Sequence, residues 1–300
     1  MNHLKTTGLG LIFTAMSCFA MAQSGQTTPN GVPQSNPYLD SIKARELRLR
    51  DIGDSMTSGI TQTRRIYSLK KFIPMLVKTL AIPGAYDYGF DSLKFMNILE
   101  PEDKSFRLLN WSLKYNDGTF RYYGAIWEKS DGPLKLIPLH CDTGSFAIDD
   151  LDTLVTGTDP WIGALYYKLI TNKYKSKTFY TLLGWDGFNY LSDRKFVDIL
   201  SFDEAGRPVF GAPVFDIKGK IKDRVVFYYS GNVQLALKYI PEYNLITFDH
   251  LVPPNPANTG NLFSYITDGS YDYLEFKKGK WVWGDDLFVN FKKPIKEAGN

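Results

Sequence analysis

Carboxylate and imidazole side chains are the groups in this sequence best suited to chemistry, and they lie where apolar segments end. Asp249 and His250 close an apolar run just before the proline-rich loop at 253–256. Binding and catalytic groups are often built on loops at the ends of rigid elements. Together with carboxylates such as Asp186 and Asp272, they could supply the general acid and base of a hydrolase. The ordinary alternative is that Asp249 caps a turn and His250 bonds to the backbone.

Residues 142–145 read Asp-Thr-Gly-Ser, which contains the core of an aspartic peptidase loop. Those enzymes bring two such loops together so that paired carboxylates share a proton and activate water. The chain carries no second copy, since residues 267–270 read Thr-Asp-Gly-Ser. A turn after the apolar run 134–139 accounts for the same residues, so we expect Asp142 to lie in a turn.

Thiol, metal and nucleotide chemistry find less support. His140 and Cys141 are adjacent, and on an extended segment adjacent side chains point to opposite faces. No His-x-His, His-x-x-x-His or paired-cysteine spacing is present, and the Asp-Gly segments lack the alternating ligands of a dedicated calcium loop. The sequence also contains no glycine-rich phosphate loop and no Gly-x-Ser-x-Gly elbow. We therefore expect neither a metal nor a cofactor.

Aromatic residues make up 15% of the chain, and several tryptophans stand beside turns. Trp185, Trp281 and Trp283 could form a platform on which sugar rings stack. Aromatic side chains also pack the cores of β-sheets, which is their commoner role. Trp281 and Trp283 share one face of an extended segment, which agrees with either use.

The first 22 residues have the pattern of a secretory signal peptide. A short basic start precedes an apolar run of roughly 12 to 15 residues, too short to span a bilayer, and Ala20 and Ala22 give the small residues of a cleavage site before Gln23. Cys18 follows Ala15-Met16-Ser17 rather than an aliphatic lipoprotein motif, so we do not expect lipidation. Residues 23–37 are rich in Gln, Ser, Thr, Asn and Pro, which predicts a flexible linker.

Cleavage would leave Cys141 as the sole cysteine, so the mature protein would hold its fold without an internal disulfide. The formal net charge of the whole chain is +3, and residues of both signs are mixed along it. The sequence therefore shows no basic cluster of the kind that binds nucleic acid. No later segment is long and apolar enough to cross a membrane. We expect a soluble protein in the periplasm or outside the cell.

The periodicity of the remaining chain changes from helical to extended. Between residues 38 and 82, Ile66, Leu69, Ile73, Leu76 and Leu80 recur at three- and four-residue spacing, with Phe72 and Val77 widening the stripe. Pro74 in this run predicts a kink or a helix that starts late. From about residue 104, alternating segments are separated by turn residues such as those at 116–118, 186–187, 231–232 and 278–279. This pattern predicts a mainly β or α+β fold, with antiparallel sheets built from successive hairpins behind a helical N-terminal segment, in one domain over 38–300.

Several of these segments resemble a group of uncharacterised secreted proteins of Bacteroidetes-type bacteria. They are 180–187 (YTLLGWDG), 195–202 (KFVDILSF), 209–215 (VFGAPVF), 246–253 and 268–281. The resemblance covers about residues 65 to 285. It implies export and a Gram-negative envelope context, and it carries no activity, cofactor or catalytic residue.

Together these patterns favour an exported, non-enzymatic protein that binds a ligand, a glycan or an envelope partner. Two alternatives remain open: an exported hydrolase whose site lies near Asp249 and His250, and a carbohydrate-binding module that uses surface tryptophans.

Overall fold

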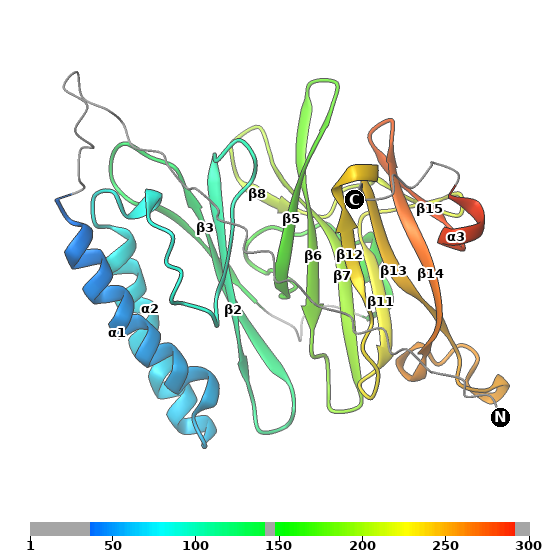
Figure 1. Ribbon diagram of the computed structural model, residues 1–300, viewed down its shortest axis with the longest axis horizontal. Coiled ribbons are helices and arrows are strands. Elements are labelled where there is room, and N and C mark those ends of the chain that lie inside the picture. The colour runs from blue at the N-terminus through cyan, green and yellow to red at the C-terminus, as the bar shows by residue number, and fades with distance from the viewer. Residues whose placement is uncertain (1–36, 142–147, 292–300) are drawn as a thin grey trace, which may run out of the picture.

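The computed structural model describes residues 37–141 and 148–291, which form one helical layer and three stacked sheets. Helices α1 (Leu39–Ser58) and α2 (Gln62–Leu80) lie side by side at one end of the molecule, and the sheets follow in succession (Figure 1). The predicted mainly β fold, with antiparallel sheets behind two N-terminal helices, is confirmed. Cleavage after Ala22, Cys18 and the linker up to residue 36 lie outside the described residues.

The sheets differ in how the chain builds them. The helix-side sheet contains β1 (Asn97–Leu99), β2 (Phe106–Lys114), β3 (Phe120–Glu128) and β4 (Lys135–His140), paired in chain order. The middle sheet has the order β11-β7-β6-β5, with β8 on β7; these are β5 (Leu165–Tyr174), β6 (Lys177–Asp186), β7 (Ser192–Phe202), β8 (Pro208–Phe210) and β11 (Val225–Ser230). The far sheet has the order β10-β9-β15-β14-β13-β12; these are β9 (Phe215–Ile217), β10 (Lys220–Lys222), β12 (Leu237–Ile240), β13 (Leu245–Val252), β14 (Ile266–Lys277) and β15 (Lys280–Gly284). The β15–β9 pair is parallel.

Three hydrophobic clusters join the four layers. Alternation along each strand sends successive side chains to opposite faces. On β2, Leu109 and Trp111 pack against the helices, whereas Leu108 packs toward the middle sheet. On β7, Phe196 faces the helix-side sheet and Val197 faces the far sheet. The middle sheet is therefore apolar on both faces and belongs to two cores.

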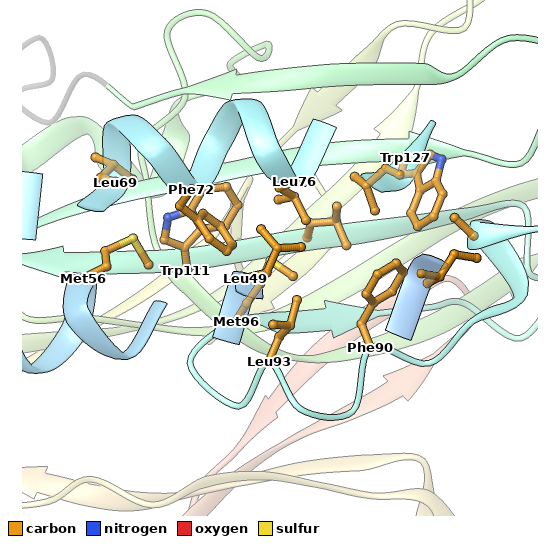
Figure 2. Close-up of a cluster of buried hydrophobic side chains, with 14 of the residues drawn as sticks. Leu49, Met56, Leu69, Phe72, Leu76, Phe90, Leu93, Met96, Trp111 and Trp127 are labelled. Carbon is orange, nitrogen blue, oxygen red and sulfur yellow. The ribbon is translucent and has the colours of Figure 1, made fainter. Parts of the chain in front are cut away.

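The helix pair is held by the cluster drawn in Figure 2. Phe72 is fully buried and lies beside Trp111 in this cluster. Its ring centroid is 5.3 Å from those of both Phe95 and Trp111. Leu69, Phe72, Leu76 and Leu80 form the buried stripe of α2. The predicted stripe is wrong in one respect, because Ile73 and Val77 are 36% and 37% exposed. Phe72, not Ile73, is the centre of the buried face.

The prediction that Pro74 delays the helix is also wrong. α2 begins at Gln62, where the Thr61 side chain accepts a hydrogen bond from Arg64 N at 3.2 Å, and it continues past Pro74. Proline removes one backbone donor from the interior of a helix. Pro74 is exposed, so the carbonyl that it leaves unbonded, that of Lys70, is near solvent.

Most predicted turns join paired strands, but one does not. The turns at 116–118, 186–187 and 278–279 connect β2 to β3, β6 to β7 and β14 to β15, and each of these pairs is antiparallel. The turn at 231–232 makes no hairpin. β11 pairs with β7 in the middle sheet, whereas β12 pairs with β13 in the far sheet. The chain crosses between sheets at this point.

Two buried ion pairs, each with a tyrosine, lie on the face of the middle sheet that packs against the helix-side sheet. In the first, Asp186 Oδ1 accepts from Tyr122 Oη at 2.7 Å and Asp186 Oδ2 accepts from Arg194 Nε at 2.8 Å. In the second, Asp198 Oδ2 accepts from Tyr166 Oη at 2.7 Å. Arg224 Nε lies 2.9 Å from Asp198 Oδ1, and both side chains of this pair are at most 2% exposed.

These tyrosines predict a loss of stability in alkali. Burial, and then the neighbouring Asp186, raises the pKa of Tyr122 well above its usual value, and burial with Asp198 does the same for Tyr166. Because the folded-state pKa is raised, the stabilisation is complete below the unfolded pKa of about 10 and is lost as pH rises above it. The free energy of unfolding of the wild type, measured by urea denaturation, should fall between about pH 9 and about pH 11. The fall should be smaller in Tyr122→Phe and in Tyr166→Phe, because each variant lacks one of the buried hydroxyls. A flat profile in the wild type would contradict this.

Among the described residues, no helix combines the length and apolar character needed to cross a membrane.

Candidate functional site

A cavity of about 200 Å³ opens where strand β11 of the middle sheet meets the far sheet. Its polar lining includes Lys218, Asp249, His250 and Asp272. Its apolar and aromatic lining consists of Val226, Phe227, Tyr228, Phe248, Leu251, Leu262, Tyr265 and Trp283. Its lining residues come from β11, β13, β14 and β15, from the turn between β9 and β10, and from the loop after β13.

A carboxylate–imidazole pair lies in the wall of this cavity. His250 Nδ1 is 2.8 Å from Asp272 Oδ2. A carboxylate can only accept, so Nδ1 carries the proton in this contact. Asp272 is 5% exposed, and its Oδ1 accepts from the backbone of Asp286 at 3.0 Å, whereas the His250 ring is 37% exposed. The buried carboxylate therefore fixes the orientation of a partly accessible imidazole.

A β-bulge between β13 and β14 places His250 at this position. Asp249 pairs with Tyr271 and Leu251 pairs with Thr267, so three residues of β14 stand opposite His250 alone. Gly269 in this bulge has φ 89°, a left-handed conformation that glycine adopts without strain. Bulges interrupt regular pairing and redirect side chains, and they are common beside functional sites. Residues 268–270 thus belong to strand β14.

Two further carboxylates lie close to His250. The hydrogen bond from the Ser270 hydroxyl is the main cause that lowers the pKa of Asp268, and nearby His250 adds to it. The hydrogen bond from Lys218 is the main cause that lowers the pKa of Asp285, with Trp283 and His250 contributing. Both groups are therefore carboxylates at neutral pH.

Trp283 forms the aromatic wall of the cavity. Its ring centroid is 4.6 Å from that of Phe248 and 6.2 Å from that of Phe227. Its Nε1 donates to Asp285 Oδ1 at 2.8 Å. Lys218 Nζ lies 2.7 Å from the same oxygen and 5.7 Å from the centroid of the Trp283 ring.

The structure brings some of the sequence-predicted site residues together. Asp249, His250 and Trp283 line the same cavity. Asp249 lies within β13 rather than at a turn, and its Oδ2 accepts from the distant backbone N–H of Ala236 at 2.7 Å. The ring of His250 bonds to the Asp272 carboxylate rather than to the backbone.

The remaining predicted residues lie elsewhere. Asp186 is bonded to Arg194 and Tyr122 in the interior between two sheets. Trp281 is fully buried, and its Nε1 donates to Thr181 Oγ1 at 2.9 Å, so it offers no face to a sugar. Trp185 is half-buried, and its Nε1 donates to Asp193 at 3.3 Å. Asp142 lies outside the described residues.

Sequence reasoning missed the parts of the site that only the fold assembles. Lys218 and Asp285 are far apart in the chain and meet because β9 pairs with β15. Phe227 and Phe248 read as ordinary core residues. The one available signal was the Asp285-Asp286 pair directly after an aromatic strand, and that signal is weak.

The arrangement can bind a small molecule and can exchange a proton with it. With its Nδ1 bonded to buried Asp272, His250 has the orientation of an imidazole that acts as a general base. The described cavity lining contains no serine, threonine or cysteine; its possible nucleophiles are the Lys218 amine, the carboxylates of Asp249 and Asp272 and the tyrosine hydroxyls. No cluster of three or more His, Cys, Asp or Glu side chains suited to a metal ion occurs within 37–141 and 148–291.

Neither a scan against protein-family models nor a search of curated proteins gives a match for this chain.

Proposed function

We propose that this is an exported, non-enzymatic protein of the cell envelope or exterior that holds a small ligand in the His250–Trp283 cavity. Export rests on the signal pattern of residues 1–22 and on the resemblance to secreted Bacteroidetes-type proteins. Binding rests on the cavity, because ligand sites are concave, largely apolar and supplied with a few placed polar groups. The cavity of about 200 Å³ fits a ligand of few heavy atoms.

The observation that carries the proposal is the convergence of an oriented imidazole and an aromatic wall on one opening. Buried Asp272 holds His250, and Phe248 supports Trp283, so neither side chain needs to be ordered when a ligand arrives. Preorganisation of this kind lowers the entropic cost of binding. A second cavity of about 300 Å³ shares Val226, Tyr228 and Leu262 with the first and leaves room for a longer ligand.

A thermal-shift screen of purified protein with small cations, anions, neutral polar molecules and glycan fragments tests the proposal. A ligand at a hundred times its Kd stabilises by about 2.7 kcal/mol, which corresponds to a rise in Tm of roughly 5 to 10 °C. Leu262→Trp should abolish the shift because Leu262 lines both cavities and is 47% exposed, so a larger ring fills the opening. Leu191→Trp, at a leucine that is 75% exposed and outside both linings, is the matched control.

The variants separate the possible outcomes. Ligands that stabilise Leu262→Trp as well as the wild type would place binding elsewhere and contradict the proposal. The alternative of a hydrolase is favoured by one observation, the 2.8 Å contact between His250 and Asp272. If the wild type hydrolyses a screened compound and His250→Asn does not, the protein is a hydrolase and the proposal of a non-enzymatic binding protein is wrong.

A further inference from the structure

The cavity already contains an ammonium group of the protein itself. Lys218 stands at the tip of the β9–β10 turn, with a φ of 52°. Its Nζ lies 2.7 Å from Asp285 Oδ1 and 5.7 Å from the centroid of Trp283. The Lys218 side chain is 59% exposed, so it can leave this position without unpacking the core.

The surroundings of that ammonium are those of a cation site. A cation within about 6 Å of an aromatic centroid is attracted by the negative face of the ring, and tryptophan is the strongest such ring. Trp283 is held in place by Phe248 at 4.6 Å and by its hydrogen bond to Asp285. The same carboxylate therefore orients the ring and pairs with the ammonium.

The charge near the opening is predominantly negative. Asp268, Asp272 and Asp285 all interact with His250, and Lys218 is the ammonium paired with one of them. Asp249, the fourth carboxylate, has Lys195 as its charged neighbour. A concave site lined by carboxylates and aromatic rings attracts small cations and repels small anions.

We propose that the ligand of this cavity is a small organic ammonium ion, which displaces the Lys218 ammonium from Asp285 and Trp283. The inference rests on the proposed binding function and adds the chemical class of the ligand. The side chain of Lys218 is itself a butylammonium group, so a primary alkylamine of that length reproduces the contact seen within the protein. Phe248 and Phe227, behind Trp283, would receive the alkyl chain.

The test is an NMR titration of the intact protein with butylammonium chloride, butanol and sodium butyrate at matched ionic strength. The chain has six tryptophans, and the indole N–H signal that disappears in Trp283→Phe identifies Trp283. Butylammonium should shift that signal saturably, whereas butanol and butyrate should bind at least about fivefold more weakly, as expected for a partly exposed cation–aromatic contact.

Three variants make the outcome specific. Asp285→Asn should weaken butylammonium binding at least about fivefold, because the charge-assisted bond is lost. Trp283→Leu should weaken it about two- to fivefold. Lys218→Met should strengthen it about two- to fivefold, since the internal competitor is removed. Lys220→Met removes the same charge from an exposed position in the same hairpin and measures the long-range part of that effect.

Several results would overturn the inference. The inference is wrong if the wild type binds butanol as tightly as butylammonium, or if butylammonium binding does not saturate. It is also wrong if Lys218→Met binds butylammonium more weakly than the wild type does. Unchanged butylammonium binding in Asp285→Asn would overturn it as well, because position 285 is exposed and its substitution leaves the core intact. If neutral or anionic compounds stabilise the protein in a manner that Leu262→Trp abolishes while butylammonium does not bind, the cavity is a binding site for another class and only the ammonium inference fails.

Discussion

Asp198→Ala should lower the free energy of unfolding by about 3 to 5 kcal/mol, because it leaves the Arg224 guanidinium buried without its carboxylate. Arg224 is completely buried between Asp198 and the backbone carbonyls of Leu151 and Leu154, to which its Nη1 donates at 2.7 and 3.0 Å. Those carbonyls do not neutralise the charge. Urea denaturation of the variant and the wild type measures the difference.

Two comparisons isolate the cause. Asp203→Ala removes an ion pair with Arg207, which is 79% exposed, and two hydrogen bonds from the turn backbone, and it should cost no more than about 2 kcal/mol. The double variant Asp198→Leu with Arg224→Met should recover part of the loss, because apolar side chains of similar volume can replace a buried ion pair. The Tyr166 hydroxyl still lacks its acceptor in that variant, so Tyr166→Phe added to it should recover more. Equal effects of Asp198→Ala and Asp203→Ala would refute the explanation.

Phe72→Ala should destabilise the protein by about 3 to 5 kcal/mol through loss of apolar contact and the cavity left behind. Phe72 is fully buried at the helix–sheet interface beside Trp111 (Figure 2). Its ring contacts those of Phe95 and Trp111 edge to face. The relaxation needed to close the gap would move both helices against β2. Denaturation followed by circular dichroism gives the loss.

The control on the same helix is Tyr67→Ala. Tyr67 is 58% exposed and has Lys71 Nζ 4.3 Å from its ring centroid, which is a surface contact. Its removal should change stability by no more than about 0.5 to 1 kcal/mol. If Phe72→Ala costs no more than Tyr67→Ala, the cluster in Figure 2 does not hold the helix pair.

The elements of the fold were more predictable than their partners. Helical and alternating periods identify α2, β2, β3, β6 and β15, because each presents an apolar face to a core. The sequence does not predict strand β5, because Lys168 and Lys173 interrupt its alternation of apolar and polar residues. The division into sheets was not visible, since a turn such as 231–232 has the same composition whether the next strand pairs locally or crosses to another sheet. Pairing partners depend on tertiary packing, which a local pattern does not encode.

The site was predictable in part. Asp249 and His250 stood out because they close an apolar run directly before a loop, where sites are often built, and Asp272 was among the carboxylates that could join them. The orientation of His250 depends on a bulge whose extra residues are in β14, and a single strand's sequence does not reveal that register. Asp186 was equally prominent in the sequence, yet its cross-strand neighbour Arg194 draws it into the interior. An acidic residue before a glycine turn therefore says little about accessibility until its neighbours across the sheet are known.

The strands of the middle and far sheets alternate along the chain, so the two sheets cannot be encoded by separate segments of the sequence. After β8 the chain leaves the middle sheet to form β9 and β10, returns for β11, and then completes the far sheet with β12 to β15. No single cut in the sequence leaves both sheets whole, because every cut between β5 and β15 divides the strands of at least one of them. The helix pair and β1 to β4, by contrast, occupy one uninterrupted stretch. That stretch can be cut out without dividing a sheet, although a replacement must supply the buried Tyr122 hydroxyl that bonds to Asp186 on β6. The two sheets around the cavity offer no such cut.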